Sequence, residues 1–562
     1  MRRAITALVL LAACGKSAPD HPNVLLVTID TLRPDSVGAE HGTPAMVAFL
    51  AEATRFPRAR SVAPMTLPAH ASMFTGLLPT AHGLHDNVTE PLPEERPFPL
   101  LAEQFRDAGY DTAAFIACGV LGSGTGIAYG FDVYDCPQDY DQRRDESVPG
   151  EERVKAAIKY MEGARGRPWF VWVHLFDPHA PYDPYPGDAR RPAAREGDPP
   201  YALYLGDVRR ADAAFEKLIA AAGGAVTVLA SDHGESFGEH DELSHGPLCY
   251  GATVDALLAV RAPGFEPGAV DRGLRSVADI APTLRRLCSL PAVPSDGRDL
   301  RGPPHETLVA ESLFVSGIHG WGQCFAVTDG DFSLVESGPR RELFDRRGDP
   351  LELQPLPLSL PAYEKLDRAL ERFRSGPLVV HDGELRASIP AYGQMRRTTT
   401  RYLPRHENAR LIDPRLYLTL WMHVEEVPWV VDMAKERRDV APLDAALRLL
   451  ANFERSSPAS PLVPFRRAAV CEAMADITGD RSWLKTAARA HVEAVEKGYS
   501  REGPIREAIR CAVAAEDPES LQRLATFLRK DGARLDPGIA SALDEAAARI
   551  DTSASHPPIP GR

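Results

Sequence analysis

Short apolar runs alternate with amphipathic segments along the first half of the chain. The runs are rich in Val, Leu and Ile without a polar face, which predicts strands buried on both sides, as in a parallel sheet. The expected strands are Asn23–Ile29, Thr112–Ala117, Trp169–Phe176 and Val226–Ala230, and the expected helices are Leu100–Ala108, Lys155–Gly163 and Tyr204–Ala222. This alternation predicts an α/β fold, a mostly parallel sheet with helices on both faces.

Polar residues follow three of these strands directly. Asp30 follows the first strand, Asp177-Pro178-His179 the third, and Asp232-His233 the fourth. A single Asp in such a place is most often a helix cap or a turn residue. Three clusters together favour one site, because ligands of open α/β sheets bind at the carboxyl ends of the strands.

Asp30, Asp232 and His233 are side chains that bind divalent cations well. A set of carboxylates and imidazole favours Zn²⁺ or Mn²⁺ over Ca²⁺, which prefers an all-oxygen shell. The sequence therefore predicts a divalent metal at this edge of the sheet.

Thr66 is the candidate nucleophile. It precedes Pro68 by two positions, and proline suits the first turn of a helix, so Thr66 is expected at a helix N-terminus. The backbone N–H groups and the helix dipole there favour an anionic ester. A metal beside Thr66 could lower the pKa of its hydroxyl and make it a nucleophile. An ordinary helix cap is the competing interpretation.

Six segments, in order over roughly Pro22–Leu356, resemble blocks of the sulfatase family in the alkaline-phosphatase-like superfamily. They are NVLLVTIDTLRPDSVG (Asn23–Gly38), TLPAHASMFTG (Thr66–Gly76), LAEQFRDAGYDT (Leu101–Thr112), FDPHAPY (Phe176–Tyr182), SDHGESFGEHDELSHG (Ser231–Gly246) and ELFDRRGDP (Glu342–Pro350). Six collinear blocks are a far more specific signal than any single motif.

The resemblance implies roles for particular residues. The residues at metal-ligand positions are Asp30, Asp232 and His233. Thr66 stands where sulfatases keep the Cys or Ser that becomes formylglycine. His179 matches the histidine that contacts the substrate ester, which suits it as the acid for the leaving group. His245 lies near a position that holds Lys in sulfatases and His in metal phosphatases, and it is the third catalytic candidate; a solvated loop residue is the alternative.

Several positions depart from the sulfatase pattern. Thr31 replaces a second metal-binding Asp, and His70 replaces the Arg that secures the nucleophile and the anion. His233 replaces an Asn. The family segment G-K-x-H is absent, and Phe115–Val120 stands in its place.

Threonine at position 66 also blocks the usual sulfatase mechanism. Formylglycine is an aldehyde, whereas the methyl group on the Thr66 β-carbon allows only a ketone. A Thr nucleophile with Asp and His ligands instead resembles the nucleotide pyrophosphatase/phosphodiesterase branch of the superfamily, which implies two-step phosphoryl transfer through a phospho-threonine. Asp177, His179 and His245 could hold a second ion, but their spacing differs from the two-metal pattern of that branch, so one ion is expected rather than two.

Three functions remain open on the sequence. The first is a metal-dependent hydrolase that cleaves phosphate mono- or diesters through Thr66. The second is a sulfuric ester hydrolase that uses Thr66 directly, without formylglycine. The third is a catalytically degenerate surface lipoprotein that binds an anionic glycan or a partner protein, an interpretation supported by the lost Lys, Arg and second Asp.

The first residues are typical of an export signal. Met1–Cys14 (MRRAITALVLLAAC) has a basic start and an apolar stretch too short to span a bilayer. Leu11–Cys14 resembles the bacterial lipoprotein box, which implies a lipidated Cys14, a tether over 15–21 and a membrane-anchored chain in the bacterial cell envelope, on the periplasmic or cell-surface side. A plain secretory signal with a chance Cys is the alternative.

The chain beyond the catalytic region, which we expect to span 22–356, is rich in Ala, Leu, Arg and Glu. We expect a helical, solenoid-like domain over 362–551, although elements of the family could continue to about Arg374. Its helices are expected at Leu443–Ala451, Phe465–Met474, Trp483–Glu496, Pro504–Ala515, Leu521–Arg529 and Ile539–Ile550. Such a surface can bind a protein partner or pack on the catalytic region, and the tail over 552–562 is expected to be disordered.

Composition excludes some classes of protein. The 562 residues are 44% hydrophobic and 25% charged, as in ordinary globular proteins, which excludes a fibrous or mainly disordered chain. A net charge of −14 gives no support for nucleic-acid binding through a basic face. Eight cysteines are too dilute for a disulfide scaffold.

Overall fold

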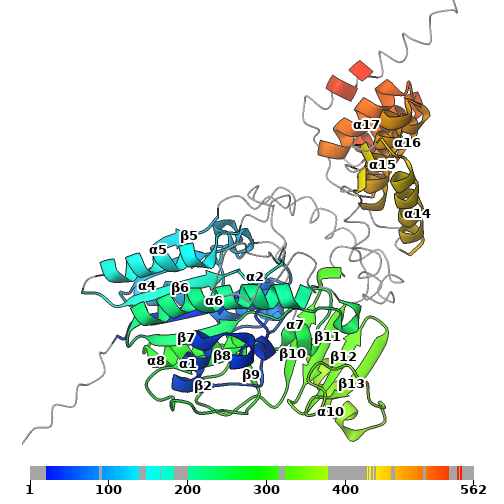
Figure 1. The fold of residues 1–562 in the computed structure, drawn as a ribbon. Helices are drawn as coiled ribbons and strands as arrows, with labels where there is room; N and C mark the ends of the chain where they lie inside the picture. The colour runs from blue at the N-terminus through cyan, green and yellow to red at the C-terminus, as the bar shows by residue number, and fades with distance from the viewer. Residues whose placement is uncertain are drawn as a thin grey trace, which may run out of the picture.

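A seven-stranded sheet forms the centre of the computed structural model (Figure 1). Its strand order is β2-β8-β7-β1-β6-β4-β5. The bounds are Thr54–Arg55 (β2), Leu258–Arg261 (β8), Val226–Ser231 (β7), Val24–Ile29 (β1), Trp169–Leu175 (β6), Asp111–Ile116 (β4) and Val133–Asp135 (β5). The strands from β7 to β5 are parallel, whereas β8 and β2 are antiparallel additions at one edge.

The structure describes most of the chain, and the statements below concern only that part. The described residues are 21–376 and 438–530 apart from 88–90, 138–146, 165, 181, 183–199, 243, 316–322, 457–461 and 498–501, together with 427, 430, 431, 434, 435, 541–543, 545 and 546.

Each face of the sheet is covered by its own set of helices. One face packs against α2 (Thr66–Thr75), α4 (Leu101–Asp107) and α8 (Ile280–Leu287). The other packs against α1 (Pro44–Glu52), α5 (Gly150–Gly163) and α6 (Pro200–Ala222). Residues of β1 alternate between these two cores, because successive side chains of a strand point to opposite faces. The predicted fold class, with helices on both faces of a mostly parallel sheet, is confirmed.

A second, antiparallel sheet follows the central one. It consists of β10 (Leu308–Ser312), β11 (Cys324–Thr328), β12 (Phe332–Ser337) and β13 (Arg340–Asp345). Helix α10 (Pro361–Arg374) packs its apolar side on this sheet, so it belongs with the elements before it. The remaining short elements are β3 (Ala59–Arg60), β9 (Arg275–Ser276), α3 (Pro79–His82) and α7 (Gly251–Val254).

The C-terminal region is helical, as predicted. Its helices are α14 (Ala441–Ser456), α15 (Leu462–Thr478), α16 (Ser482–Glu496), α17 (Glu502–Ala514) and α18 (Pro518–Lys530). Consecutive helices bury apolar side chains against one another in two successive cores. Most of the helix predicted at Ile539–Ile550 lies outside the described residues, as do the N-terminal signal and tether. In the described part of the chain, the helices are too short or too polar to cross a membrane.

Candidate active site

Two adjacent strands carry the acidic and imidazole groups to one edge of the sheet. β1 and β7 are parallel neighbours with Ile29 opposite Ser231, so Asp30 and Asp232 emerge side by side. One ligand atom each from Asp30, Asp232 and His233 lies within 4.8 Å of the other two, and all three residues are fully buried. The loops near positions 30 and 232 therefore meet as the sequence predicts.

The charges in this cluster leave room for a cation. The Asp232 Oδ1 accepts hydrogen bonds from the backbone N–H groups of Thr31 (3.2 Å) and His233 (2.8 Å). The Asp232 Oδ2 and the Asp30 Oδ1 are buried and have no hydrogen-bond partner. Within the described ranges, neither carboxylate forms an ion pair with Lys or Arg. Two buried carboxylates without such a partner fit a divalent cation, because unpaired buried charge is costly.

The electrostatics of the cluster also fit a cation site. Burial alone would raise the pKa of Asp30, but a hydrogen bond from His174 and nearby imidazoles hold that pKa below its ordinary value. Burial and the charge of Asp30 raise the pKa of Asp232 well above its ordinary value. His233 donates from Nδ1 to the Gly234 carbonyl (2.9 Å), which leaves the lone pair of its Nε2 facing Asp232 Oδ2 at 3.5 Å. The cluster thus offers carboxylate oxygens and a bare imidazole nitrogen to an ion.

Thr66 is the first residue of α2, and its hydroxyl faces this cluster. The Thr66 Oγ1 lies 3.3 Å from Asp30 Oδ2 and 3.4 Å from His233 Nε2, and the residue is only 1% exposed. The Asn87 Oδ1 accepts the Leu67 N–H (2.9 Å) at the start of the same helix. The structure therefore places Thr66 at a helix N-terminus with its oxygen at the acid and imidazole groups.

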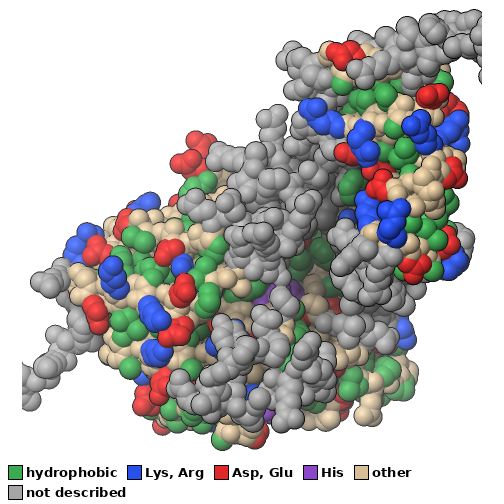
Figure 2. Space-filling view, turned by 45° about the horizontal axis from the view of Figure 1, so that its top comes forward, with side chains coloured by type: hydrophobic (Ala, Val, Ile, Leu, Met, Phe, Trp, Pro, Cys, Tyr) green, Lys and Arg blue, Asp and Glu red, His purple; other side chains and the backbone are tan. Residues whose placement is uncertain are grey.

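His179 and His245 form a pair beside the cluster. Their Nε2 atoms lie 3.2 Å apart, and the ring of His245 is 4.2 Å from that of His233, centre to centre. Each donates from Nδ1 to a backbone carbonyl, His179 to Ala180 (2.6 Å) and His245 to Pro64 (3.0 Å). Two bare Nε2 lone pairs facing each other require a proton or a cation between them. Both residues are only partly buried. Figure 2 shows histidine side chains at the surface, near the middle of the view.

The hydrogen bond described for Asp177 is with the start of α5. Its Oδ1 accepts the backbone N–H of Gly150 (3.4 Å), the first residue of α5. The contacts that the structure gives for Asp177 are thus those of a helix cap, while His179 from the same strand end reaches the site.

Two of the departures from the sulfatase pattern, His70 and Thr31, have structural roles. His70 is fully buried below Thr66, where Nδ1 donates to the Thr66 carbonyl (2.8 Å) and Nε2 faces the Thr28 hydroxyl (3.0 Å). Burial lowers the pKa of His70 to about 3, so this imidazole is neutral and does not replace the cationic Arg. Thr31 adopts a left-handed backbone (φ 54°), which is strained for a β-branched residue and directs its N–H to Asp232.

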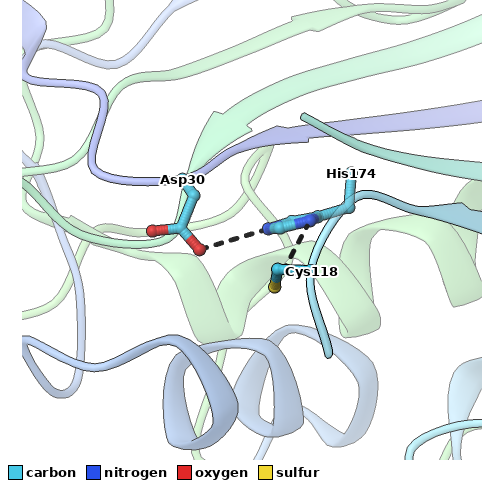
Figure 3. Close-up of side chains that lie close together, drawn as sticks. All are labelled: Asp30, Cys118 and His174. Atoms are coloured by element: carbon cyan, nitrogen blue, oxygen red, sulfur yellow. Dashed lines mark hydrogen bonds and ion pairs between the residues drawn. The ribbon is translucent and has the colours of Figure 1, made fainter. Parts of the chain in front are cut away.

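Sequence reasoning missed His174, which lies under the site with Cys118 (Figure 3). The His174 Nε2 is 3.3 Å from Asp30 Oδ2, and the Cys118 Sγ is 4.0 Å from His174 Nδ1. The available signal in the sequence was a polar residue at the end of an otherwise apolar strand. In the structure, β6 pairs in register with β1 and places His174 opposite Thr28.

Comparison with known proteins identifies the family. Residues 22–289, which carry all of the site residues above, match the sulfatase family model. This region belongs to the sulfatase family of the alkaline-phosphatase-like superfamily. The chain is therefore an ester hydrolase of that superfamily.

Similar proteins share this catalytic region. The endo-4-O-sulfatase of Bacteroides thetaiotaomicron is 25% identical, over 51% of this chain and 75% of its own length. The sulfatase YidJ of Escherichia coli is 24% identical, over 60% of this chain and 83% of its own length. The fold resembles that of the phosphonate monoester hydrolase of Agrobacterium radiobacter, with a TM-score of 0.51 and 21% identity over 63% of this chain and 95% of the other.

Proposed function

We propose that this sulfatase-family hydrolase cleaves phosphate mono- or diesters with Thr66 as its nucleophile. The observation that carries the proposal is the position of the Thr66 Oγ1, 3.3 Å from Asp30 Oδ2 and 3.4 Å from His233 Nε2 at the N-terminus of α2. A hydroxyl in that position can reach an ester whose anionic oxygens are held by the helix N-terminus. Asn87 supports it by fixing the first turn of α2.

Asp30, Asp232 and His233 would hold a divalent cation, with Zn²⁺ or Mn²⁺ favoured over Ca²⁺. When bound, the cation lowers the pKa of a neighbouring hydroxyl and offsets the charge that develops on the ester oxygens. Thr31 holds Asp232 from the backbone, so that one carboxylate oxygen stays available. One such ion balances the carboxylates of this cluster, and we propose one ion rather than two.

The reaction would proceed in two displacements. Thr66 would pass its hydroxyl proton to Asp30 Oδ2 (3.3 Å) and attack phosphorus, so that a threonine–phosphorus ester bond forms and the bond to the leaving alcohol breaks. The leaving oxygen takes a proton from the His179–His245 pair. Burial lowers the pKa of His245 well below its ordinary value, and we assign the donor role to the Nε2 of His179, which lies 3.2 Å from the Nε2 of His245. In the second step water attacks the phospho-threonine, a proton of that water returns to the His179–His245 pair, and the released Thr66 oxygen takes its proton back from Asp30 as the phosphate product leaves.

Sulfuric ester hydrolysis is the second candidate, and the named activity of the endo-4-O-sulfatase relative favours it. Threonine cannot form the formylglycine aldehyde, so such a sulfatase would have to use the Thr66 hydroxyl directly. Phosphate is favoured here because a Thr nucleophile beside a His at the metal-ligand position of His233 resembles the phosphodiesterase branch of the superfamily rather than the sulfatases.

A substrate panel tests the proposal. The purified chain, with its metal content measured, is assayed on 4-nitrophenyl phosphate, bis(4-nitrophenyl) phosphate and 4-nitrophenyl sulfate. We expect turnover of a phosphate ester that disappears in Thr66→Ala, while metal content stays unchanged. Thr75→Ala is the matched control, because Thr75 lies at the other end of α2 and its hydroxyl bonds to the Ala71 carbonyl and the Leu77 N–H, away from the cluster. Full activity of Thr66→Ala would reject the nucleophile, and turnover of the sulfate alone would select the second candidate.

We further propose that Cys14 is lipidated and anchors the chain in the bacterial cell envelope, with the helical region free to bind a protein partner. The motif at Leu11–Cys14 supports the anchor. Mass spectrometry of the mature N-terminus tests it, and Cys14→Ala is expected to release the chain from the membrane fraction. If neither a lipid nor membrane association is found, a plain secretory signal explains the first residues. A chain that also lacked turnover and metal would match the degenerate binding protein.

A further inference from the structure

Asp30 is held from a second side by residues that bear no metal-ligand role above. β6 lies beside β1 in parallel register, with His174 opposite Thr28 and Leu175 opposite Ile29. His174 projects under the carboxylate of Asp30, where its Nε2 lies 3.3 Å from Asp30 Oδ2. Both side chains are fully buried, so water cannot take the place of this contact.

The proton positions follow from the partners of each ring nitrogen. An ionised carboxylate only accepts hydrogen bonds, so the His174 Nε2 carries the hydrogen and donates it to Asp30. The other ring nitrogen, Nδ1, faces the Cys118 Sγ at 4.0 Å. Burial raises the pKa of Cys118 well above its ordinary value, so the thiol keeps its hydrogen and can donate it weakly to Nδ1. Cys118, His174 and Asp30 thus form a continuous chain of contacts (Figure 3).

The two oxygens of Asp30 are consequently unlike. Oδ2 receives the His174 hydrogen and also the hydroxyl of Thr66 (3.3 Å). Oδ1 has no hydrogen-bond partner and lies 3.7 Å from the His233 Nε2. A carboxylate held by one oxygen in this way cannot rotate its other oxygen away from the cluster.

We propose that His174 is a positioning residue, which fixes one oxygen of Asp30 so that the other stays directed at the cation. The inference rests on the proposed function in one respect, that Asp30 is a ligand. Cys118, which faces the Nδ1 of His174, comes from Phe115–Val120, the segment that stands in place of the sulfatase G-K-x-H. In the sheet Ile116 of that segment lies opposite His174, which explains how the replaced segment reaches the floor of the site.

Metal affinity of the full-length chain tests the inference more directly than activity. The metal is stripped, and the dissociation constant for Mn²⁺ is measured by calorimetry for the wild type, His174→Gln and His174→Met. Gln keeps an N–H donor near the position of the imidazole Nε2, whereas Met fills a similar volume without a donor. We expect Met to weaken Mn²⁺ binding by roughly 10- to 100-fold, the usual cost of losing a ligand's hydrogen-bond partner, and Gln to stay within about threefold. At saturating Mn²⁺ the kcat of His174→Met should approach that of the wild type, because the residue acts through the affinity of the site.

Two further variants separate positioning from simple packing. Cys118→Ala should weaken Mn²⁺ binding more than Cys118→Ser, which keeps a donor, and this pair decides the question if His174→Met does not fold. His82→Met is the matched control, since His82 is fully buried and bonds Ser72 (3.0 Å) in the same layer. It should lower the melting temperature and leave the Mn²⁺ affinity unchanged.

The possible results distinguish a failure of the positioning role of His174 from a failure of its premise, that Asp30 is a metal ligand. Wild-type affinity in His174→Met, or equal weakening in His174→Gln, overturns the positioning role while Asp30→Asn still weakens binding. If Asp30→Asn has no effect either, the cation binds elsewhere, and the proposed function fails together with this inference. A second Mn²⁺ in the wild type that disappears in Cys118→Ala would show direct ligation by the Asp30, Cys118 and His174 group, and would replace the hydrogen-bonded chain.

Discussion

Two regions of the protein bring acidic and imidazole groups equally close, but only one leaves them uncompensated. At the sheet edge the cluster is Asp30, Asp232 and His233, and in the helical region it is Glu472, His491 and Cys511. In each cluster one ligand atom per residue lies within 4.8 Å of the others. Proximity of ligand types therefore does not distinguish them.

Charge compensation distinguishes the two clusters. Both oxygens of Glu472 are occupied, one by the His491 Nε2 at 2.7 Å and the other by the Arg510 guanidinium. Burial opposes the ionised form of Glu472, but these partners hold its pKa below the ordinary value. At the sheet edge, Asp30 and Asp232 each keep one buried oxygen without a hydrogen bond. The helical cluster is complete as folded, whereas the sheet-edge cluster keeps two buried carboxylate oxygens that a cation would occupy.

The largest expected effect comes from removing a carboxylate at the sheet edge. Asp232→Asn should reduce kcat/KM on the order of 10³-fold, because charge stabilisation at a reacting ester contributes effects of this size. It should also abolish the metal content of the purified chain. Glu472→Gln is the matched carboxylate-to-amide change in the helical region, and it should leave both quantities unchanged. An active Asp232→Asn variant that still binds metal would remove the distinction between the clusters.

Metal removal should destabilise the region around the sheet edge. A cation at about 100 times its Kd stabilises the folded chain by about 2.7 kcal/mol, so chelation should lower the melting temperature by several degrees. In the metal-free state Asp232→Asn should melt above the wild type, because it removes one of two facing carboxylates. Differential scanning calorimetry with and without chelator measures both effects. Equal melting temperatures of the metal-free and metal-loaded wild type would contradict the expectation that a cation binds these carboxylates.

A smaller effect is expected from the imidazole of the helical cluster. His491→Met leaves one oxygen of Glu472 without its donor, which should cost about 1–3 kcal/mol of stability. Turnover should not change, because His491 bonds within α15 and α16 and lies in the helical region. Thermal unfolding and the ester assay together check this. Loss of turnover at unchanged stability would show that the helical cluster has a part in catalysis.

The smallest expected effect is a gain of zinc affinity in the helical cluster, and it tests most directly whether charge compensation separates the two clusters. Arg510→Gln removes the cationic partner of Glu472, so the helical cluster should gain weak affinity for Zn²⁺ that the wild type lacks. Zinc titration of the metal-stripped Asp232→Asn/Arg510→Gln variant measures this gain without competition from the sheet edge. If no zinc binds, geometry rather than charge separates the two clusters.

The parts of the site that sequence could predict are those that follow from local rules. Asp30 and Asp232 end apolar strands, and parallel strands present their carboxyl ends at one edge, so their meeting was predictable. Pro68 indicated a helix start at Thr66, and α2 begins there. The role of each of these residues in chemistry stays a prediction until the variants are measured.

Other features depend on long-range contacts, which the local sequence pattern does not predict. The four-stranded sheet β10–β13 was not predicted as a sheet, because strand pairing and register are long-range. Asp177 looked like a ligand of a possible second ion, yet its recorded contact is with the start of α5. The sequence around His174 predicts a buried strand, and no neighbouring residue indicates that its side chain contacts Asp30.

The sequence by itself determined the order of the four central strands β1, β4, β6 and β7 and the residue types at their ends. It also determined the absence of a route to formylglycine at Thr66, because periodicity and side-chain chemistry are local properties. Only the tertiary structure decided which oxygen of each carboxylate is bonded, which nitrogen of each histidine is bare, and that Arg510 neutralises one cluster while no Lys or Arg in the described chain pairs with the other. Those choices depend on donors brought in from distant segments, and they determine where a cation can be held.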